Sequence, residues 1–273
     1  MSRRAATVLV LAALVLGACT ACDVQVGSEG LSLEVATGQA RDSWSRSLPL
    51  AAGGRLELIN VNGQIDAQPA EGSTVDLTAE RSARATTDDA ARDLLQKVEM
   101  REETSADRVR VEVRAPRTLG ISQVSVKWTI RVPRGVVVDL RNVNGRVEMS
   151  GLDGEVHART VNGGVSGRGL TATTVEASTV NGGVDVELAR PLPGEGQVSL
   201  EAVNGGVSLA LPPDSQATLT ARVTNGGIRT GDLPFEARGE NTRRRFEGTL
   251  NGGGASVRLQ TTNGGVRISK SGA

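Results

Sequence analysis

The feature that most constrains this chain is a short motif, Val180-Asn181-Gly182-Gly183-Val184, that keeps returning along the sequence. From the copy at Asn144 onward, successive copies are roughly 18, 19, 23, 21, 26 and 12 residues apart, a loose period typical of stacked repeats. The motif therefore decides the fold class. Its other copies are centred on Asn62, Asn144, Asn162, Asn204, Asn225, Asn251 and Asn263.

Two structures satisfy the pattern around each copy. Residues 175–180 and 184–188 alternate apolar and polar side chains at period two, as strands do. Asn-Gly between two such runs indicates a β-hairpin, so an antiparallel meander is one reading. In the other reading each copy forms one corner of a β-solenoid coil, and copies stack at about 4.8 Å.

Only the solenoid explains why asparagine recurs in one phase. Glycine supplies the positive φ that a tight corner needs, and asparagine tolerates it while bonding nearby backbone. Stacked amides can then bond from coil to coil, as identical side chains do in other stacked strands. We expect a structural asparagine ladder made of Asn144, Asn162, Asn181, Asn204, Asn225, Asn251 and Asn263.

Composition favours a thin core. The chain has four aromatic residues, Trp44, Trp128, Phe235 and Phe246, and no tyrosine, so a thick globular interior would be hard to fill. A solenoid core of Val, Leu, Ile and Ala needs no large rings. The 34 glycines lack a G-X-Y period, which excludes collagen and fits repeated corners.

We expect an all-β chain, with a β-solenoid of the parallel β-helix or β-roll kind at residues 136–273. Residues 48–135 are expected to form an N-terminal β-rich cap with one short α-helix at about 88–102. Thr87 is the expected N-cap of this helix, and acids follow it in the first turn, where the helix dipole favours them. The cap would cover backbone that an open coil leaves unpaired.

The N-terminus has the form of a lipoprotein leader. Two arginines precede a short apolar run that ends in Leu16-Gly17-Ala18-Cys19. A basic start, a short apolar segment and small residues before the cut are typical of a secretory signal peptide. The ending resembles the bacterial lipobox, so we expect residues 1–18 to be removed and Cys19 to carry lipid.

Other readings of the leader fit less well. A membrane-spanning helix needs about 20 apolar residues, and this run is shorter. Cys19 and Cys22 form a C-x-x-C pair, but the redox version of that motif expects a βαβ setting. Residues 19–47, rich in small residues, are expected to be a lipidated tether with at most one short strand.

The repeats, the segment from Arg55 to Ile65 and the leader together resemble the bacterial putative-adhesin domain family of unknown function. The resemblance covers roughly residues 45–270 and implies a repetitive all-β surface or envelope protein. It offers no catalytic residues to carry over. The chain departs from an even repeat at residues 251–254, where the aliphatic residue after the two glycines is missing.

Charge and chemistry exclude several functions. Lys plus Arg equal Asp plus Glu at 31 each, and removing Arg3 and Arg4 leaves a charge of −2, so nucleic acid is not an expected partner. The single histidine, His157, lies in an alternating strand pattern. One histidine and one spare cysteine cannot assemble a zinc site, so neither metal nor cofactor is expected.

We expect an exported, non-catalytic protein, held on a membrane through its N-terminal lipid, whose β scaffold acts as an adhesin-like or structural surface. The membrane would be the outer one if the cell is Gram-negative. Arg243, Arg244 and Arg245 are a candidate contact for an anionic envelope polymer or a lipid head group. The alternatives are a β-helix enzyme acting on envelope polysaccharide and an accessory or sensor subunit of an envelope stress system. The sequence leaves the partner and the oligomeric state open.

Overall fold

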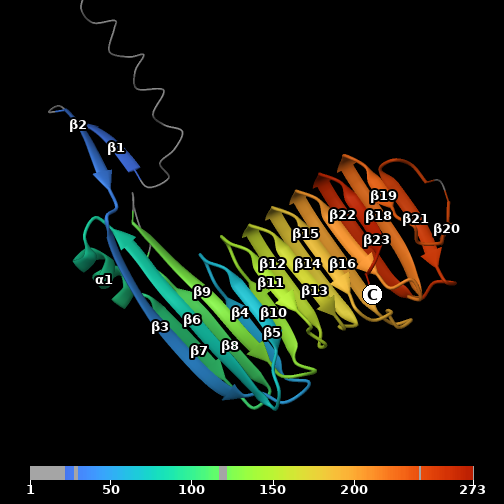
Figure 1. The fold of residues 1–273 in the computed structure, drawn as a ribbon, viewed down its shortest axis with the longest axis horizontal. Helices are drawn as coiled ribbons and strands as arrows, with labels where there is room; N and C mark the ends of the chain where they lie inside the picture. Colours follow the sequence, from blue (N-terminus) through green and yellow to red (C-terminus); the bar gives the residue numbers. More distant parts are fainter. Residues whose placement is uncertain (1–21, 28–29, 117–121, 240, 273) are drawn as a thin grey trace, which may run out of the picture. The chain divides into compact units, whose positions relative to one another are not determined.

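The computed structural model describes residues 22–27, 30–116, 122–239 and 241–272, so the expected signal peptide and Cys19 lie outside the described residues (Figure 1). The chain divides into two compact units. The first unit comprises Met1–Arg41, Ser82–Lys97 and Pro116–Val124, and the second comprises Asp42–Arg81, Val98–Ala115 and Ser125–Ala273.

The first unit contains an antiparallel strand pair and a helix. Strands β1 (Cys22–Gly27) and β2 (Gly30–Val35) pair with each other, and helix α1 is Asp88–Gln96. Thr87 caps the helix, because its side chain accepts a hydrogen bond from the amide of Ala90. Asp88 in turn accepts from the amide of Gln39, which fixes the start of the helix to the chain before it.

The helix ends earlier than the sequence pattern indicated. We expected it to reach about residue 102, but it ends at Gln96, and Glu99–Thr104 form strand β7. The reason is tertiary: β7 pairs antiparallel with β8 (Arg108–Arg114), which gives its backbone groups partners that a longer helix would have given locally.

The expected tether at 19–47, with at most one short strand, differs from the structure, because β1 and β2 fall within it and Gly38–Pro49 form the twelve-residue strand β3. Trp44, which we placed in the tether, meets Trp128 edge to face with ring centroids 5.7 Å apart. Trp128 is completely buried, and Arg46 lies 5.0 Å over the Trp44 ring. These aromatic contacts explain why a segment without clear alternation is held as a strand.

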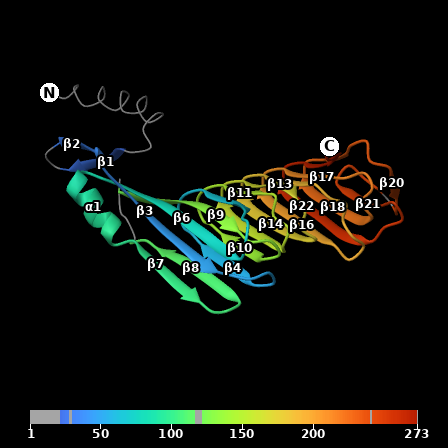
Figure 2. The same ribbon diagram turned by 60° about the horizontal axis from the view of Figure 1, so that its bottom comes forward.

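The second unit is a stack of coils, each with a first strand in an eleven-stranded sheet and a second strand in a ten-stranded sheet (Figures 1 and 2). Like strands of neighbouring coils pair in parallel. In stack order the coils are β8 with β9 (Gln123–Val132), β4 (Arg55–Ile59) with β5 (Ile65–Pro69), β10 (Val137–Arg141) with β11 (Val147–Ser150), β12 (Val156–Asn162) with β13 (Val165–Leu170), β14 (Thr174–Asn181) with β15 (Val184–Leu188), β16 (Gln197–Asn204) with β17 (Val207–Leu211), β22 (Ala255–Asn263) with β23 (Val266–Lys270), and β18 (Ala217–Asn225) with β19 (Ile228–Thr230).

The stack order differs from the chain order at both ends. Coil β4–β5 lies between β8–β9, which follows it in sequence, and β10–β11. Coil β22–β23, the last in sequence, lies between β16–β17 and β18–β19. The final strands of the chain are therefore hydrogen-bonded on both sides instead of lying at an exposed edge.

Antiparallel strands complete the sheets. At one side of the eleven-stranded sheet, β21 (Arg245–Leu250) pairs with β18, and the short β20 (Phe235–Ala237) pairs with β21. At its other side lies β7. The ten-stranded sheet continues beyond β9 with β6 (Thr74–Ala85) and β3. The segment that follows β19 thus extends the eleven-stranded sheet through β20 and β21.

The core consists of aligned rows of aliphatic side chains between the two sheets. Alternate residues of each strand point inward, so the same coil position is apolar in coil after coil. Members of two of these rows are at most 1 % exposed. One row is Leu56, Val138, Val156, Val175, Val198, Val257 and Leu219, and the other is Ile65, Val147, Val165, Val184, Val207 and Val266.

The all-β, solenoid-like fold class is confirmed: two mainly parallel sheets face each other, and the described residues contain one helix. Among those residues, no helix combines the length and the apolar character needed to cross a membrane.

Candidate functional site

Seven asparagines form a continuous ladder along one corner of the coil stack. The side-chain amide of each asparagine after Asn62 donates to the side-chain oxygen of the asparagine before it in the stack, at 2.7–3.0 Å. The backbone follows the same path, since the Gly182 amide donates to the carbonyl of Asn204 in the next coil. In stack order the ladder is Asn62, Asn144, Asn162, Asn181, Asn204, Asn263 and Asn225.

Asn251 does not belong to this ladder, contrary to the sequence expectation. It follows strand β21 and has a left-handed φ of 49°. Its side-chain amide donates to the carbonyls of Pro213 and Ser215. This copy of the motif makes a tight turn after an antiparallel strand, so its asparagine bonds a loop instead of a coil neighbour. Asn62 takes the seventh place.

The first glycine after each ladder asparagine is required by two separate constraints. At Gly182 the backbone has a φ of 154°, and at Gly145 it has a φ of 134°. A side-chain carbon at Gly182 would also lie 2.0 Å from the carbonyl oxygen of Gly163 in the preceding coil. Only glycine allows the coils to approach this closely at the corner.

A second row of hydrogen bonds lies inside the corner, two residues before four of the seven ladder asparagines. The hydroxyls of Thr160, Thr179 and Thr261 donate to the first-glycine carbonyl of the preceding coil at 2.7–3.0 Å. Asn142 donates in the same way to Gly63. The sequence carried this signal, a Thr or Asn at a fixed offset, and we did not recognise it.

A row of exposed valines stands immediately before the asparagine ladder. Each of these valines is 36–42 % exposed, although the alternating strand residues on either side of this row are polar or buried. In the two remaining ladder coils the same place is taken by Thr262 and Thr224. The corner therefore presents an aliphatic row beside an amide row. The valines are Val61, Val143, Val161, Val180 and Val203.

A groove runs along the other side of the ladder, where the second glycine of each corner lies. One depression of about 560 Å³ and another of about 420 Å³ share Gly206 and Ser208, so they are continuous. In stack order the glycines of the floor are Gly164, Gly183, Gly206, Gly265 and Gly227.

The three consecutive arginines do not act as one patch. Arg245 pairs with Glu247 at 2.7 Å, and Arg244 donates to the carbonyl of Thr224 at 3.4 Å. Arg243 lines the larger depression of the groove together with Arg229 and Arg267 from the coils. The sequence pattern thus pointed to one groove residue, Arg243, and missed the other two.

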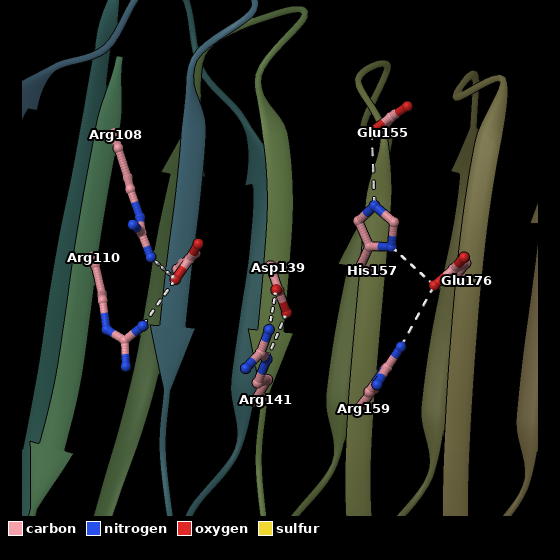
Figure 3. A network of polar contacts seen from close by, with 9 residues as sticks. Arg108, Arg110, Asp139, Arg141, Glu155, His157, Arg159 and Glu176 are labelled. Atoms are coloured by element: carbon pink, nitrogen blue, oxygen red, sulfur yellow. Dashed lines mark hydrogen bonds and ion pairs between the residues drawn. The ribbon is translucent and has the colours of Figure 1, made fainter. Parts of the chain in front are cut away.

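The outer face of the eleven-stranded sheet carries a network of paired charges (Figure 3). His157 lies between Glu176, 3.1 Å from Nδ1, and Glu155, 3.7 Å from Nε2. Arg159 also reaches Glu176, at 3.6 Å. Surface pairs of this kind contribute about 0–1 kcal/mol each, and here they engage the carboxylates that a catalytic reading would need.

Further along the same face, Arg141 contacts Asp139 through two hydrogen bonds at 2.7 and 3.1 Å. These bonds and the charge of Asp139 raise the pKa of the Arg141 guanidinium above its usual value. Arg108 and Arg110 both reach Glu57, and the hydrogen bond to Glu57 raises the pKa of Arg108. Asp139 and Glu57 are therefore each paired with neighbouring arginines in the folded chain.

Acidic side chains of the coil stack are divided between the two sheets. Glu148, Asp185 and Glu187 belong to strands of the ten-stranded sheet, whereas Glu155 precedes β12 of the eleven-stranded sheet. Glu148 is also engaged by Gln64 and Arg146. Within the described part of the chain, no group of three or more His, Cys, Asp or Glu side chains could hold a metal ion.

Comparison with one known structure supports the fold. A protein from Clostridium sporogenes ATCC 15579, named "putative cell adhesion protein", superposes with a TM-score of 0.50 at 12 % identity, covering 84 % of this chain and 100 % of its own. A "putative adhesin" from Bacteroides fragilis NCTC 9343 gives a TM-score of 0.36 at 10 % identity, covering 83 % of this chain and 97 % of its own.

A search of curated proteins finds no sequence match to this chain. A family model does match it, over residues 138–269, the stretch that carries the ladder from β10 to β23. The sequence resemblance to an adhesin-type family of unknown function is thereby confirmed. Residues 138–269 match the family model described as Toastrack DUF4097.

Proposed function

We propose that this chain is a non-catalytic, lipid-anchored protein of the cell envelope whose coil stack serves as an adhesin-like binding surface. The observation that carries the proposal is the corner where five exposed valines run beside the asparagine ladder. Apolar side chains repeated in one exposed row are a common mark of an interaction site.

The geometry of the corner suits repeated binding. Adjacent valines lie one strand spacing apart, about 4.8 Å, because their coils pair in register. The ladder and the backbone bonds beneath it hold the row rigid, so a partner would lose little free energy in ordering it. The names of the structural neighbours agree with this binding role, and the lipoprotein-like leader agrees with a location in the cell envelope.

The binding role is tested by replacing Val161, Val180 and Val203 with threonine. Threonine keeps the branched shape and already occupies this place at Thr224 and Thr262, so the fold should be retained. We expect the triple variant to lose retention on cell-envelope material. The matched control changes Ser178 and Ser199, on the outer face of the eleven-stranded sheet, to alanine and should bind as before.

Equal retention of the valine variant and the wild type would contradict this corner as the binding surface. Anchoring is tested separately by Cys19→Ser. We expect that variant to leave the membrane fraction, whereas the wild type stays with membranes and is labelled by fatty acid. A Cys19→Ser protein that still sediments with membranes would contradict the lipid anchor.

A further inference from the structure

We infer that the glycine-floored groove beside the ladder binds a linear anionic polysaccharide. The inference goes beyond the proposed function, because it names a ligand class for a second surface, on the other side of the ladder from the valine row. It starts from the second glycine of each corner. This position does not need glycine, since its backbone is outside the left-handed region.

Two coils show that the corner accepts a side chain there, because Gln64 and Arg146 occupy the equivalent place. At Gly183 a side-chain carbon would meet only the carbonyl oxygen of Gly206, at 3.4 Å. Backbone conformation therefore does not explain why the second corner residue is glycine in five successive coils. These glycines leave an open channel whose floor carries no side chains.

The end of the channel around coils β22–β23 and β18–β19 is strongly basic. Arg229 and Arg267 are direct partners on neighbouring parallel strands, so their Cα atoms lie one strand spacing apart and their side chains leave the same face of the sheet. Like charges in that position repel each other unless an anion lies between or above them. Among the described residues, no carboxylate lines this depression and no ion pair engages either arginine.

A third arginine enters from a separate element. Arg243 lies in the segment between β20 and β21, and its Nε would be 3.4 Å from a side-chain carbon placed on Gly227. The side chain thus leans over the last glycine of the floor. Three guanidinium groups converge on one open depression, the arrangement that binds carboxylate or sulfate groups.

The far end of the channel is also lined by arginines, but it is less strongly basic. Arg146 and Arg168 line it, with Arg146 already paired to Glu148 at 3.1 Å and Asp185 lying between the two ends. From Gly164 to Gly227 the floor crosses four strand spacings, or about 19 Å. A chain ligand is expected to gain affinity with length, because each further unit meets another coil.

The floor favours a sugar chain over a peptide. The backbone carbonyls of the floor already accept hydrogen bonds from backbone amides: Gly183 from Val165, Gly206 from Val184, and Gly265 from Val207. A peptide would therefore find no free backbone edge on which to add a strand. A polysaccharide needs none, because its hydroxyls can bond the Asn and Ser side chains along the walls while its acidic groups meet the arginines.

The test uses the full-length chain in detergent, applied to immobilised polygalacturonate, dextran and poly-glutamate. We expect retention on polygalacturonate that weakens with salt, none on dextran, and retention on poly-glutamate at least about tenfold weaker. Addition of inorganic phosphate should compete only weakly, because it occupies one end of the channel. The double variant Arg243→Ser/Arg267→Ser should lose about tenfold or more in affinity for polygalacturonate.

Two further variants separate shape from charge. Arg131→Ser/Arg258→Ser removes the same charge from exposed strand positions outside the groove and should bind as the wild type does. Gly206→Gln fills the channel without changing charge, using the residue found at Gln64, and should bind weakly. Gly183→Gln repeats that test in a second coil. Circular dichroism and melting curves would show that each variant is folded.

Equal losses from the two arginine pairs would show a net-charge effect and overturn the inference. So would polygalacturonate binding that survives both glycine substitutions, or poly-glutamate binding as tight as polygalacturonate binding. If the wild type ignores polygalacturonate but envelope material still retains it through the valine row, the groove inference fails and the proposed function stands.

Discussion

The two corners of each coil follow different rules. At the asparagine corner, the two strands of each of five coils are separated by two glycines, as at residues 182–183 and 205–206. At the opposite corner, the connection is three residues long at 171–173 and eight at 189–196. The first corner sets the register of the coils, and the second absorbs the differences in length, so the sequence period is loose although the stack is regular.

The strongest test of the different roles of the two corners is to insert one glycine at each. An insertion between Gly182 and Gly183 shifts β15 by one residue, which turns Val184 outward and Asp185 into the core. We expect the free energy of unfolding to fall by more than about 4 kcal/mol, from lost apolar burial and a buried charge. The measurement is chemical denaturation of the variant and the wild type.

The matched insertion lies between Gly194 and Glu195, in the exposed part of the long connection. A longer surface loop costs little, so the change should stay within about 0.5 kcal/mol. Similar losses at both corners would contradict the division of roles.

The next effect separates the two glycines of one corner. Gly182→Ala combines an unfavourable φ with a side-chain carbon 2.0 Å from the Gly163 carbonyl, and should cost about 3 kcal/mol or more. Gly183→Ala meets only an oxygen at 3.4 Å and should change stability by less than about 0.5 kcal/mol. Thermal unfolding of both variants measures the difference, and equal destabilisation would contradict separate requirements at the two glycines.

The ladder itself gives a smaller effect. Asn181→Ala removes two amide hydrogen bonds, one to Asn162 and one from Asn204. Because the ladder is exposed, water can replace part of each bond, and we expect a loss of about 1 kcal/mol. Asn251→Ala serves as the comparison outside the ladder. An unchanged denaturation midpoint for Asn181→Ala would show that the amides add nothing to stability.

The smallest expected effect is a gain. Ala202 occupies the place that Thr179 and Thr261 hold in the adjacent coils, where the threonine hydroxyl donates to a first-glycine carbonyl. Ala202→Thr should supply the missing donor to the carbonyl of Gly182 and stabilise the chain by about 0.5–1 kcal/mol. A destabilised variant would show that the inner row depends on more than the presence of a hydroxyl.

Much of the regular corner could be predicted from the sequence, because the corner is a local structure. Asparagine and glycine recur at positions whose backbone demands them, and the flanking alternation predicts the strands. The same local reasoning failed at Asn251, since an identical tripeptide also makes a turn after an antiparallel strand. Strand β3 was missed because long-range contacts around Trp44, and not alternation, hold it.

The order of the coils lay beyond sequence reasoning. Every coil presents similar aliphatic rows, so the pattern of one coil does not say which other coil it joins. The placement of β22–β23 inside the stack depends on the path of the whole segment from β18 to β21. The basic groove was missed for the same reason, because Arg229, Arg243 and Arg267 come together only through that order.

The most direct test of the stacked corner is cysteine cross-linking along the ladder, in a chain whose own cysteines, Cys19 and Cys22, are replaced by serine. The stack places Asn204 one strand spacing, about 4.8 Å, from Asn263, within the range of a disulfide. Asn225 lies two spacings from Asn204, about 9.6 Å, which is too far. We predict that Asn204→Cys/Asn263→Cys oxidises to a disulfide and Asn204→Cys/Asn225→Cys does not; the reverse result would contradict the coil order and the ladder built on it.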